Sequence, residues 1–223
     1  SYWLYRDKVG RREIMHNDFM KAMDFRHACK LFDEDRKIPK ETMHYILEAG
    51  RKSPSSFGQE GWKFLVISNE TLKAKLRPVC WDQPQITSCS HLVVILSAIE
   101  DLRPSSGTPA KRFSRRPLPL EKIEASIQRY ENFLADTFSS KEKIYAWGAR
   151  QCYIALANMM TAAAYEGIDS CPIEGMEKER VEEILQIDTY KYQVAVLVPF
   201  GYRANPQSKQ IRRSFEEVVE FID

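Results

Sequence analysis

The sequence predicts a single α+β domain over residues 1–223. Helical and strand-like patterns alternate irregularly along the chain, and no internal repeat is visible. No linker divides the chain into two parts, and 43% of its residues are hydrophobic, the ordinary proportion for a globular protein with a sizeable core. One domain of mixed helices and strands therefore accounts for the chain most simply.

The first hundred residues are expected to hold three helices and two strands. Apolar side chains at helical spacing predict the first helix, a proline opens the second, and Asn69 caps the third. The first strand is expected to be buried, and the segment 81–85 after the third helix is expected to be irregular. The predicted elements are helices over 11–24 and 39–53, a strand over 62–68, a helix over 69–77 and a strand over 91–97.

The longest predicted helix covers 143–167 in the second half of the chain. Tyr153, Leu156, Ala157 and Met160 recur at helical spacing in it. We expect this helix to be central, buried on more than one side or packed against its copy. The other predicted elements are helices over 120–138 and 177–186 and a strand over 192–199.

Two segments are expected to depart from the compact domain. Residues 101–140 are predicted to form a mobile excursion, because four prolines and five basic residues crowd its first half. Those charges have two interpretations: a solvated loop, or an arginine-rich rim that attracts a phosphate-bearing substrate. Residues 203–223 are predicted to form a C-terminal arm that carries basic residues over 208–214.

Charge and cysteine content exclude several classes of protein. The formal net charge is +2, from 33 basic and 31 acidic residues, so no global field indicates binding to nucleic acid or to a membrane surface. The five cysteines form no Cys-x-x-Cys pair, which argues against a disulfide framework and for a reducing compartment. The apolar runs are too short to span a bilayer, and residues 1–12 lack the apolar region of a signal peptide. We interpret the protein as cytosolic.

Common catalytic motifs are absent. The chain has no Gly-x-Gly-x-x-Gly and no Gly-x-x-x-x-Gly-Lys-Ser/Thr, which disfavours a dinucleotide-type Rossmann loop and a P-loop. Its four histidines form no His-Glu-x-x-His pair, and its Cys and His residues lack metal-ligand spacing, so no metal site is predicted. No Gly-x-Ser-x-Gly elbow nominates a nucleophile, and we assign no catalytic side chain.

The loop over 169–176 is the strongest local candidate for a binding site. Pro172 restricts the backbone, and Gly175 allows close approach to a flat ligand or a positive φ. The backbone N–H groups of Glu174 and Gly175 are then available as outward donors. A simple turn between helices is the alternative interpretation, since proline and glycine occur in ordinary loops.

Other loop residues supply charges and hydroxyl groups that match this loop. Basic side chains and hydroxyls suit a phosphate, and backbone donors over an apolar Pro-Ile floor suit a flat heteroaromatic ring. Together these groups fit a flavin mononucleotide (FMN), although spacing alone supports this weakly. The residues concerned are Arg26, Lys30, Lys209, Arg212, Ser55, Ser56, Glu174 and Gly175.

Five elements in order resemble the nitroreductase family of flavoproteins. They are Arg26-His-Ala-Cys-Lys30, Ser53-Pro-Ser-Ser56 with Trp62-Lys-Phe after it, Ser90-His-Leu-Val-Val, Pro172-Ile-Glu-Gly175 and the late basic element. The resemblance runs from about Phe25 to the C-terminus and is greatest to the oxygen-insensitive NAD(P)H nitroreductases. It implies a central, mostly antiparallel sheet flanked by helices and an intertwined homodimer.

The resemblance also implies a role for each matching residue. The Arg26–Lys30 motif, with His27 and Ala28 inside it, would hold the flavin phosphate and pyrimidine edge. Ser55 and Ser56 would come from the other subunit. Pro172 and Ile173 would lie against one ring face, with the amides of Glu174 and Gly175 directed at N5 and O4, while Arg212 and Lys209 would clasp the phosphate.

Several positions depart from the family pattern. Ala28 replaces a serine hydroxyl, and Gly58 begins a Gly-Gln-Glu-Gly segment where the family usually has Asn-x-Gln-Pro. Asp82 stands where an asparagine often meets the pyrimidine edge, and it accepts but does not donate. Gln85 stands where some members carry a second lysine, and Lys209 lies one residue earlier than the family spacing.

The resemblance implies an FMN-dependent NAD(P)H oxidoreductase. NADH or NADPH would reduce the flavin by hydride transfer to N5, and a nitroaromatic or quinone acceptor would then take its place. Two alternatives stay open. The same fold serves flavoenzymes with other acceptors, such as reductive dehalogenases or flavin-destroying enzymes, and a flavin-binding protein without substantial turnover would act as a redox-responsive partner.

Overall fold

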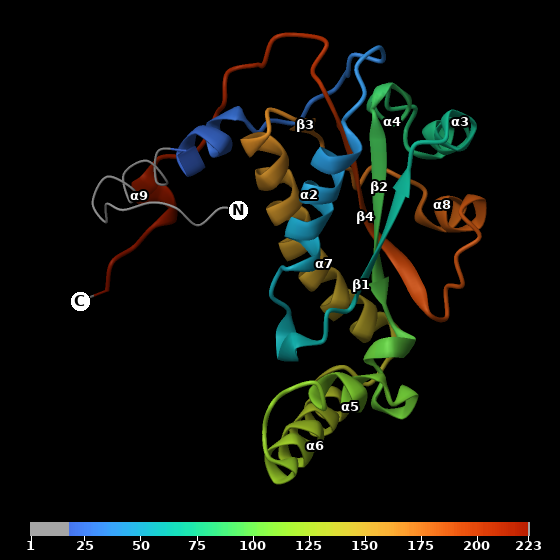
Figure 1. Cartoon of the computed structure of the whole chain (residues 1–223), viewed down its shortest axis with the longest axis vertical. Helices are drawn as coiled ribbons and strands as arrows, with labels where there is room; N and C mark the ends of the chain where they lie inside the picture. The colour runs from blue at the N-terminus through green and yellow to red at the C-terminus, as the bar shows by residue number, and fades with distance from the viewer. Residues whose placement is uncertain (1–17, 223) are drawn as a thin grey trace.

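A four-stranded sheet forms the centre of the computed structural model, which describes residues 18–222 (Figure 1). The strands are β1 (Trp62–Ile67), β2 (His91–Ala98), β3 (Asp169–Ser170) and β4 (Tyr192–Gly201). Their order across the sheet is β1-β2-β4-β3, and each neighbouring pair is antiparallel. This confirms the predicted α+β class and its antiparallel sheet.

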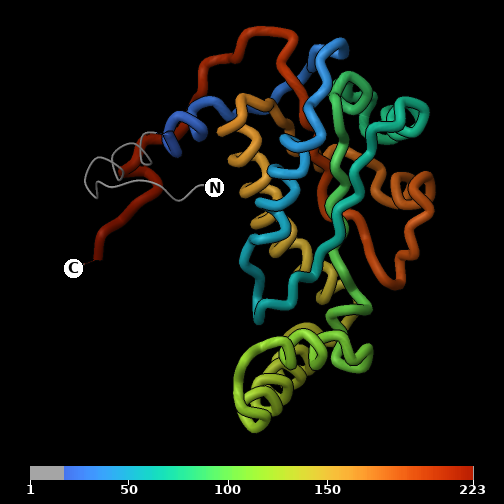
Figure 2. Tube along the Cα trace, in the orientation of Figure 1, coloured from blue at the N-terminus to red at the C-terminus, as the bar shows by residue number. Residues whose placement is uncertain are grey.

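Helices cover both faces of the sheet (Figures 1 and 2). One layer holds α2 (Lys40–Arg51) and α7 (Lys141–Tyr165), and the other holds α3 (Glu70–Val79), α4 (Gln85–Ser88) and α8 (Lys178–Ile184). Val93 and Ile95 of β2 pack in the core beneath α2 and α7, whereas Leu92 and Val94 pack in the core beneath α3 and α8. Because both faces are covered, β2 is an almost continuous apolar run.

The strand β1 corrects one expectation. It was predicted to be buried, but it lies at the edge of the sheet and pairs with β2 alone. Lys63 and Val66 are exposed, and only Ile67 in the strand is fully buried. An apolar run of this length is compatible with a central or an edge strand, and only the pairing decides between them.

The helix α7 is buried along part of its surface, and Leu156 is among its buried residues. Cys152, Ala155 and Met159 face the core, while Tyr153 is 37% exposed and Ala157 is also exposed. The helix is apolar on several sides, so its periodicity does not single out the buried face. Apolar side chains therefore remain on the outer side of α7.

The segment 101–140 forms a lobe at the end of the sheet (Figure 1). It contains η2 (Glu100–Leu102), η3 (Pro104–Ser106), α5 (Thr108–Phe113) and α6 (Leu120–Thr137). Phe113, Tyr130 and Trp147 are buried in its small core. Two of the prolines that suggested irregular structure instead stand in the first turns of η3 and α5, where proline is tolerated. Mobility of this lobe stays a prediction.

The predicted C-terminal arm extends away from the sheet (Figure 2). Its one helix, α9 (Phe215–Val218), begins with a capping box between Ser214 and Glu217. The apolar side chains of Ile211, Phe221 and Ile222 are 78–91% exposed. Near the other end of the chain, residues 18–25 are helical, and the part of the predicted 11–24 helix before residue 18 lies outside the described residues.

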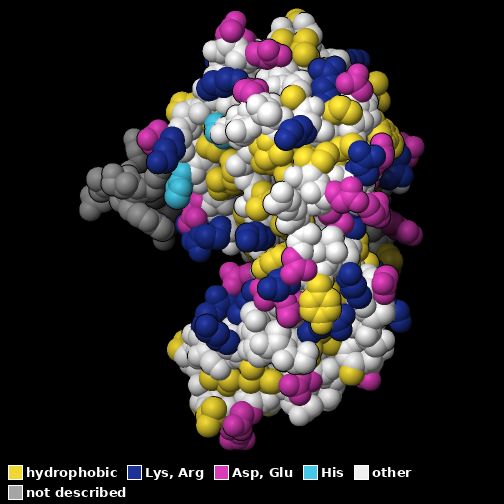
Figure 3. Space-filling view, turned by 90° about the vertical axis from the view of Figure 1, so that its right-hand side faces the viewer, with side chains coloured by type: hydrophobic (Ala, Val, Ile, Leu, Met, Phe, Trp, Pro, Cys, Tyr) yellow, Lys and Arg dark blue, Asp and Glu magenta, His cyan; other side chains and the backbone are white. Residues whose placement is uncertain are grey.

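The face seen from the side of α3 and α8 carries mixed charges (Figure 3). Basic and acidic side chains alternate over this face, and the lobe is set off from the main body by a constriction. No helix within residues 18–222 is long and apolar enough to cross a membrane. All five cysteines are buried as free thiols.

Candidate functional site

The loop after β3 is tied to the sheet rather than forming a free turn. The N–H of Ile173 donates to the Leu197 carbonyl at 2.8 Å, and the Leu197 N–H donates back at 3.1 Å. The Ile173 side chain is 2% exposed and packs in the core between the sheet and α3. Within residues 18–222, the N–H groups of Glu174 and Gly175 donate to no acceptor. The loop is thus held in place with two backbone donors available.

Gly175 is required by a neighbouring side chain. A β-carbon at this position would lie 2.6 Å from Cε3 of Trp81, closer than carbon atoms pack. Its φ is not positive, so close approach and not backbone handedness explains the glycine. Nε2 of Gln83 also donates to the Gly175 carbonyl at 2.9 Å. The segment 81–83 therefore lies directly against the loop.

Two separate segments bring polar side chains to Cys171. The ammonium of Lys30 lies 3.7 Å from the Cys171 sulfur, and Nε2 of Gln85 lies 3.8 Å from it. Burial raises the pKa of the Cys171 thiol, and Lys30 opposes that shift without cancelling it. The pKa of Arg26 is lowered first by burial and then by repulsion from Arg212. The structure thus places Lys30 and Gln85 against Cys171, with Arg26 near them and Arg212 near enough to Arg26 to repel it.

The pair Arg26 and Arg212 fits the phosphate of a flavin nucleotide. Two like charges near each other repel, and an anion between them would relieve that repulsion. Together with the unpaired amides of Glu174 and Gly175, these cations match the donor set that FMN requires. Arg26, Lys30 and Arg212 would hold its phosphate and pyrimidine edge, and the loop amides would face its ring.

A buried ion pair fixes the Arg26–Lys30 motif and the start of the arm. Asp169 is 4% exposed, and Nη2 of Arg203 lies 2.7 Å from its carboxylate. Nδ1 of His27 lies 3.6 Å from the same carboxylate. The N–H of Cys29 donates to the Ser170 carbonyl at 3.1 Å, in a bridge that pairs Ala28 with Ser170. His27 and Ala28 are therefore placed by β3, beside a cavity of about 190 Å³ that includes Lys30.

The predicted serine residues lie apart from these cations. We call residues 53–61 the serine loop; it follows the C-terminal end of α2 and contacts α7 near its middle, whereas residues 25–31 lie toward the other end of α2 (Figure 1). Oγ of Ser55 accepts from the Glu60 N–H at 2.8 Å, and the Ser56 N–H donates to Oε1 of Gln151 at 2.9 Å. One chain does not bring Ser55 and Ser56 to Arg26. The resemblance assigns these serines to the site of a second subunit.

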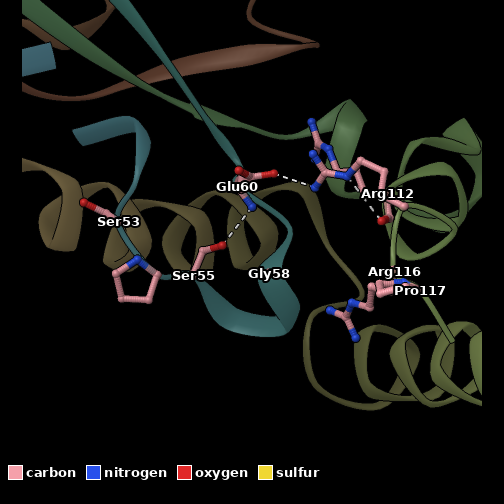
Figure 4. A pocket seen from close by; sticks show the side chains of 9 residues that line it. Ser53, Ser55, Gly58, Glu60, Arg112, Arg116 and Pro117 are labelled. Carbon is pink, nitrogen blue, oxygen red and sulfur yellow. Dashed lines mark hydrogen bonds and ion pairs between the residues drawn. The ribbon is translucent and has the colours of Figure 1, made fainter. Parts of the chain in front are cut away.

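The serine loop borders a second cavity of about 620 Å³ (Figure 4). Arginines from α5 and the turn after it reach toward the loop. Its lining residues are Ser53, Pro54, Ser55, Gly58, Glu60, Arg112, Arg115, Arg116 and Pro117. Gly58 has a φ of +62°, so the positive-φ conformation that glycine tolerates shapes this loop.

Two predicted residues have other surroundings in the chain. Asp82 has a φ of +51°, and its carboxylate accepts from Nε of Arg77 at 2.8 Å. Lys209 is exposed and makes no hydrogen bond or ion pair with the other described residues. The Asp82 carboxylate is thus already engaged by Arg77, and within residues 18–222 no hydrogen bond or ion pair holds Lys209 beside Arg26.

An apolar hollow lies between α7 and the loop after β3. Its volume is about 400 Å³, and its lining includes Leu156, Met160 and Pro172. The hydroxyl of Tyr153 donates to the Glu174 carboxylate at its rim. Burial first, and then Glu174, raise the pKa of Tyr153, so this hydroxyl stays protonated at neutral pH. The apolar outer side of α7 therefore opens beside the candidate site.

Sequence reasoning did not nominate several residues that shape the site. Trp81, Gln83 and Arg203 each contact the loop or its base from a distant segment, and no spacing in the sequence relates them. Only Asp169 could have indicated one of these contacts from the sequence, since a carboxylate at the start of an otherwise apolar loop needs a buried partner. No group of three or more His, Cys, Asp or Glu residues in the described part of the chain could hold a metal ion.

Solved structures share this fold. A nitroreductase-like protein of Streptococcus mutans has a TM-score of 0.84 at 19% identity, and the match covers 94% of this chain and 100% of that chain. A protein of Exiguobacterium sibiricum, provisionally named a nitroreductase and solved in complex with FMN, has a TM-score of 0.79 at 21% identity, with 92% and 97% covered. The sheet with a helical layer on each face is a nitroreductase-like α+β fold.

Sequence comparison gives the family. The nitroreductase family model matches residues 23–202. A protein of Haemophilus influenzae, provisionally named an NAD(P)H nitroreductase, is 40% identical over 218 residues, which cover 94% of this chain and 99% of that relative. The chain belongs to the nitroreductase family, which confirms the family that its motifs resemble.

Proposed function

We propose that this protein is an FMN-dependent NAD(P)H oxidoreductase that reduces nitroaromatics or quinones. The observation that carries the proposal is the pair of unsatisfied N–H groups of Glu174 and Gly175 beside the cations Arg26, Lys30 and Arg212. The names of its relatives support a reduced nicotinamide as the electron donor, and one structural neighbour holds FMN. Reductant and acceptor would occupy one site in turn.

The chain's own residues bind and orient the cofactor in this account. Arg26 and Arg212 neutralise the phosphate, with Lys209 as a further cation supplied by the arm. Lys30 places a positive charge at the pyrimidine edge, and Gln85 extends that polar edge. Bound FMN would supply the two-electron redox chemistry, so no acid–base side chain is needed.

Four further residues, Pro172, Ile173, Ala28 and Asp82, were assigned to the wall and the edges of the flavin site. Pro172 and the backbone of Ile173 form the wall, because the Ile173 side chain itself packs into the core. The departures at Ala28 and Asp82 remove one hydroxyl and engage one carboxylate elsewhere. We therefore expect flavin affinity to depend mainly on the cations and the loop amides.

We propose that the working form is a homodimer with two sites. Ser55, Ser56 and Gly58 would complete the site of the partner subunit, since the serine loop contacts Gln151 of α7 and lies apart from residues 25–31. The apolar outer side of α7 and the exposed Ile211, Phe221 and Ile222 of the arm are surfaces that a second copy would cover. The buried free thiols support the reducing cytoplasm as its compartment.

Purified protein tests the cofactor and the assembly separately. Protein mixed with FMN and passed through a desalting column should retain the visible absorbance of a bound flavin, one per chain. Sedimentation equilibrium should give twice the 26.0 kDa chain mass. Colourless protein that gains no flavin would remove the cofactor assignment, and a monomer that still binds flavin would remove only the dimer.

A further inference from the structure

The cavity beside the serine loop is built around three arginines. Nη1 of Arg112 donates to the Gln59 carbonyl at 2.6 Å, and Nη2 of Arg116 donates to the Phe57 carbonyl at 2.7 Å. Nη2 of Arg115 donates to the Glu60 carboxylate at 2.6 Å. The three side chains are thus held by the loop that they face, and each keeps further N–H donors.

The charges in this cavity do not cancel. Arg112 pairs with Asp101 at 3.5 Å, and Arg115 pairs with Glu60 at 2.6 Å. Arg116 has no carboxylate partner among residues 18–222. Its guanidinium instead lies over the Phe113 ring, 4.6 Å from the ring centroid. The cavity therefore presents one uncompensated guanidinium in a fixed position.

The backbone of the serine loop lies against that guanidinium. A β-carbon on Gly58 would lie 3.3 Å from Nη2 of Arg116, so the loop backbone approaches the cation closely. Ser53 and Ser55 also line the cavity (Figure 4). Oγ of Ser53 already donates to the Ala49 carbonyl at 2.9 Å, whereas Oγ of Ser55 accepts from the Glu60 N–H and keeps its own proton as a donor. A guanidinium with free N–H groups and one available hydroxyl in the same cavity is suited to a phosphate monoester.

We propose that this cavity binds the 2′-phosphate of NADPH and makes NADPH the preferred reductant. The inference rests on the proposed function, because it places the serine loop beside the partner subunit's flavin. NADPH and NADH differ only in that phosphate, so a site that distinguishes them must recognise a dianion. The flavin phosphate is assigned to Arg26 and Arg212, so the Arg116 cavity is not needed to hold it and is available to the reductant.

The test compares wild type with Arg116→Gln and Arg116→Lys. Flavin reduction by each nucleotide is followed anaerobically in a stopped-flow instrument, and the efficiency with NADPH is divided by that with NADH. Loss of a charged hydrogen bond should lower this ratio about ten- to hundredfold in Arg116→Gln. Arg116→Lys keeps the charge without the fork and should give an intermediate ratio.

A matched control is Arg129→Gln, because Arg129 is exposed on α6 and does not line the cavity. Its ratio should equal that of wild type. A merely structural role of Arg116 in holding Phe57 would lower both efficiencies equally and leave the ratio unchanged, which overturns the proposal. A wild-type preference for NADH overturns it as well.

Binding of 2′-AMP separates this inference from the proposed function. Isothermal titration of wild type should show 2′-AMP binding that Arg116→Gln loses, while 5′-AMP binds weakly to both. If neither nucleotide reduces the flavin, the proposed function fails, whatever 2′-AMP does. If both reduce it, and 2′-AMP and 5′-AMP bind equally, the proposed function stands and the phosphate site is wrong. Inorganic phosphate that equals 2′-AMP as a competitor would show an adventitious ion only.

Discussion

The indole ring of Trp81 occupies the space where Gly175 would carry a side chain, 2.6 Å from the position of its β-carbon. A residue 72% exposed to solvent thereby restricts a loop whose amides we assign to the flavin. Any side chain added at Gly175 therefore collides with Trp81 whether or not a ligand is bound. The effect of a substitution on stability must thus be separated from its effect on flavin binding.

Gly175→Ala should destabilise the protein by about 1–3 kcal/mol, because the added methyl group overlaps the Trp81 ring. Trp81→Ala should remove most of that cost in the double variant. Urea denaturation of the two single variants and the double variant measures this coupling. Additive costs would mean that the cost of Gly175→Ala does not come from its contact with Trp81.

The Trp81→Ala background also isolates the role of the loop in flavin binding. Gly175→Val in that background should still lower FMN affinity at least about tenfold, since the backbone would no longer approach the ring. Fluorescence titration with FMN measures this affinity. Affinity equal to that of Trp81→Ala alone would refute close backbone approach.

Lys30→Met should lower FMN affinity about ten- to hundredfold, the loss expected for a hydrogen bond to a charged group. Lys30 lies 3.7 Å from the Cys171 sulfur, and no carboxylate in the described part of the chain pairs with it. Lys75→Met is the matched control, because Lys75 is exposed on α3 away from the loop. Equal affinities of the two variants would remove Lys30 from the site.

Asp169→Asn should destabilise the protein by about 3 kcal/mol, the low end of the range for a broken buried ion pair, because Arg203 keeps a quarter of its side chain exposed. It should also weaken FMN binding, since His27 and Arg203 lose their common partner. Thermal unfolding and FMN titration check the two effects. Asp136→Asn, at an exposed position on α6, should change neither.

Stability should fall as the pH rises above about 8.5, the ordinary pKa of a free thiol. Burial raises the pKa of both Cys89 and Cys152 to about 12. Between these values the unfolded chain loses thiol protons that the native protein keeps, so each thiol lowers the free energy of unfolding by up to about 1.4 kcal/mol per pH unit. Cys152→Ala should reduce that slope. A slope identical to that of wild type in urea titrations over pH 7–10 would contradict this.

Local signals predicted much of the fold. Pro39 precedes α2, Oδ1 of Asn69 accepts from the Leu72 N–H at the start of α3, and the apolar runs became β2 and β4. These features depend on a few neighbouring residues. The two-residue strand β3 was missed, because its definition rests on pairing with β4 and on no local pattern.

Long-range packing explains what the sequence did not reveal. Arg26, Lys30 and the 169–176 loop were singled out by residue type, and the fold brings them together. The contact of Trp81 with Gly175 and that of Arg203 with Asp169 join segments with no fixed spacing. The sequence did not single out the buried side of α7, because its outer side is apolar as well.

Anaerobic titration of the FMN-loaded protein with NADPH and NADH tests the central claim most directly. We predict that the visible absorbance of the bound flavin bleaches with one equivalent of reduced nicotinamide per flavin and returns when a quinone is added. Flavin that binds but is bleached by neither nucleotide would contradict the oxidoreductase assignment.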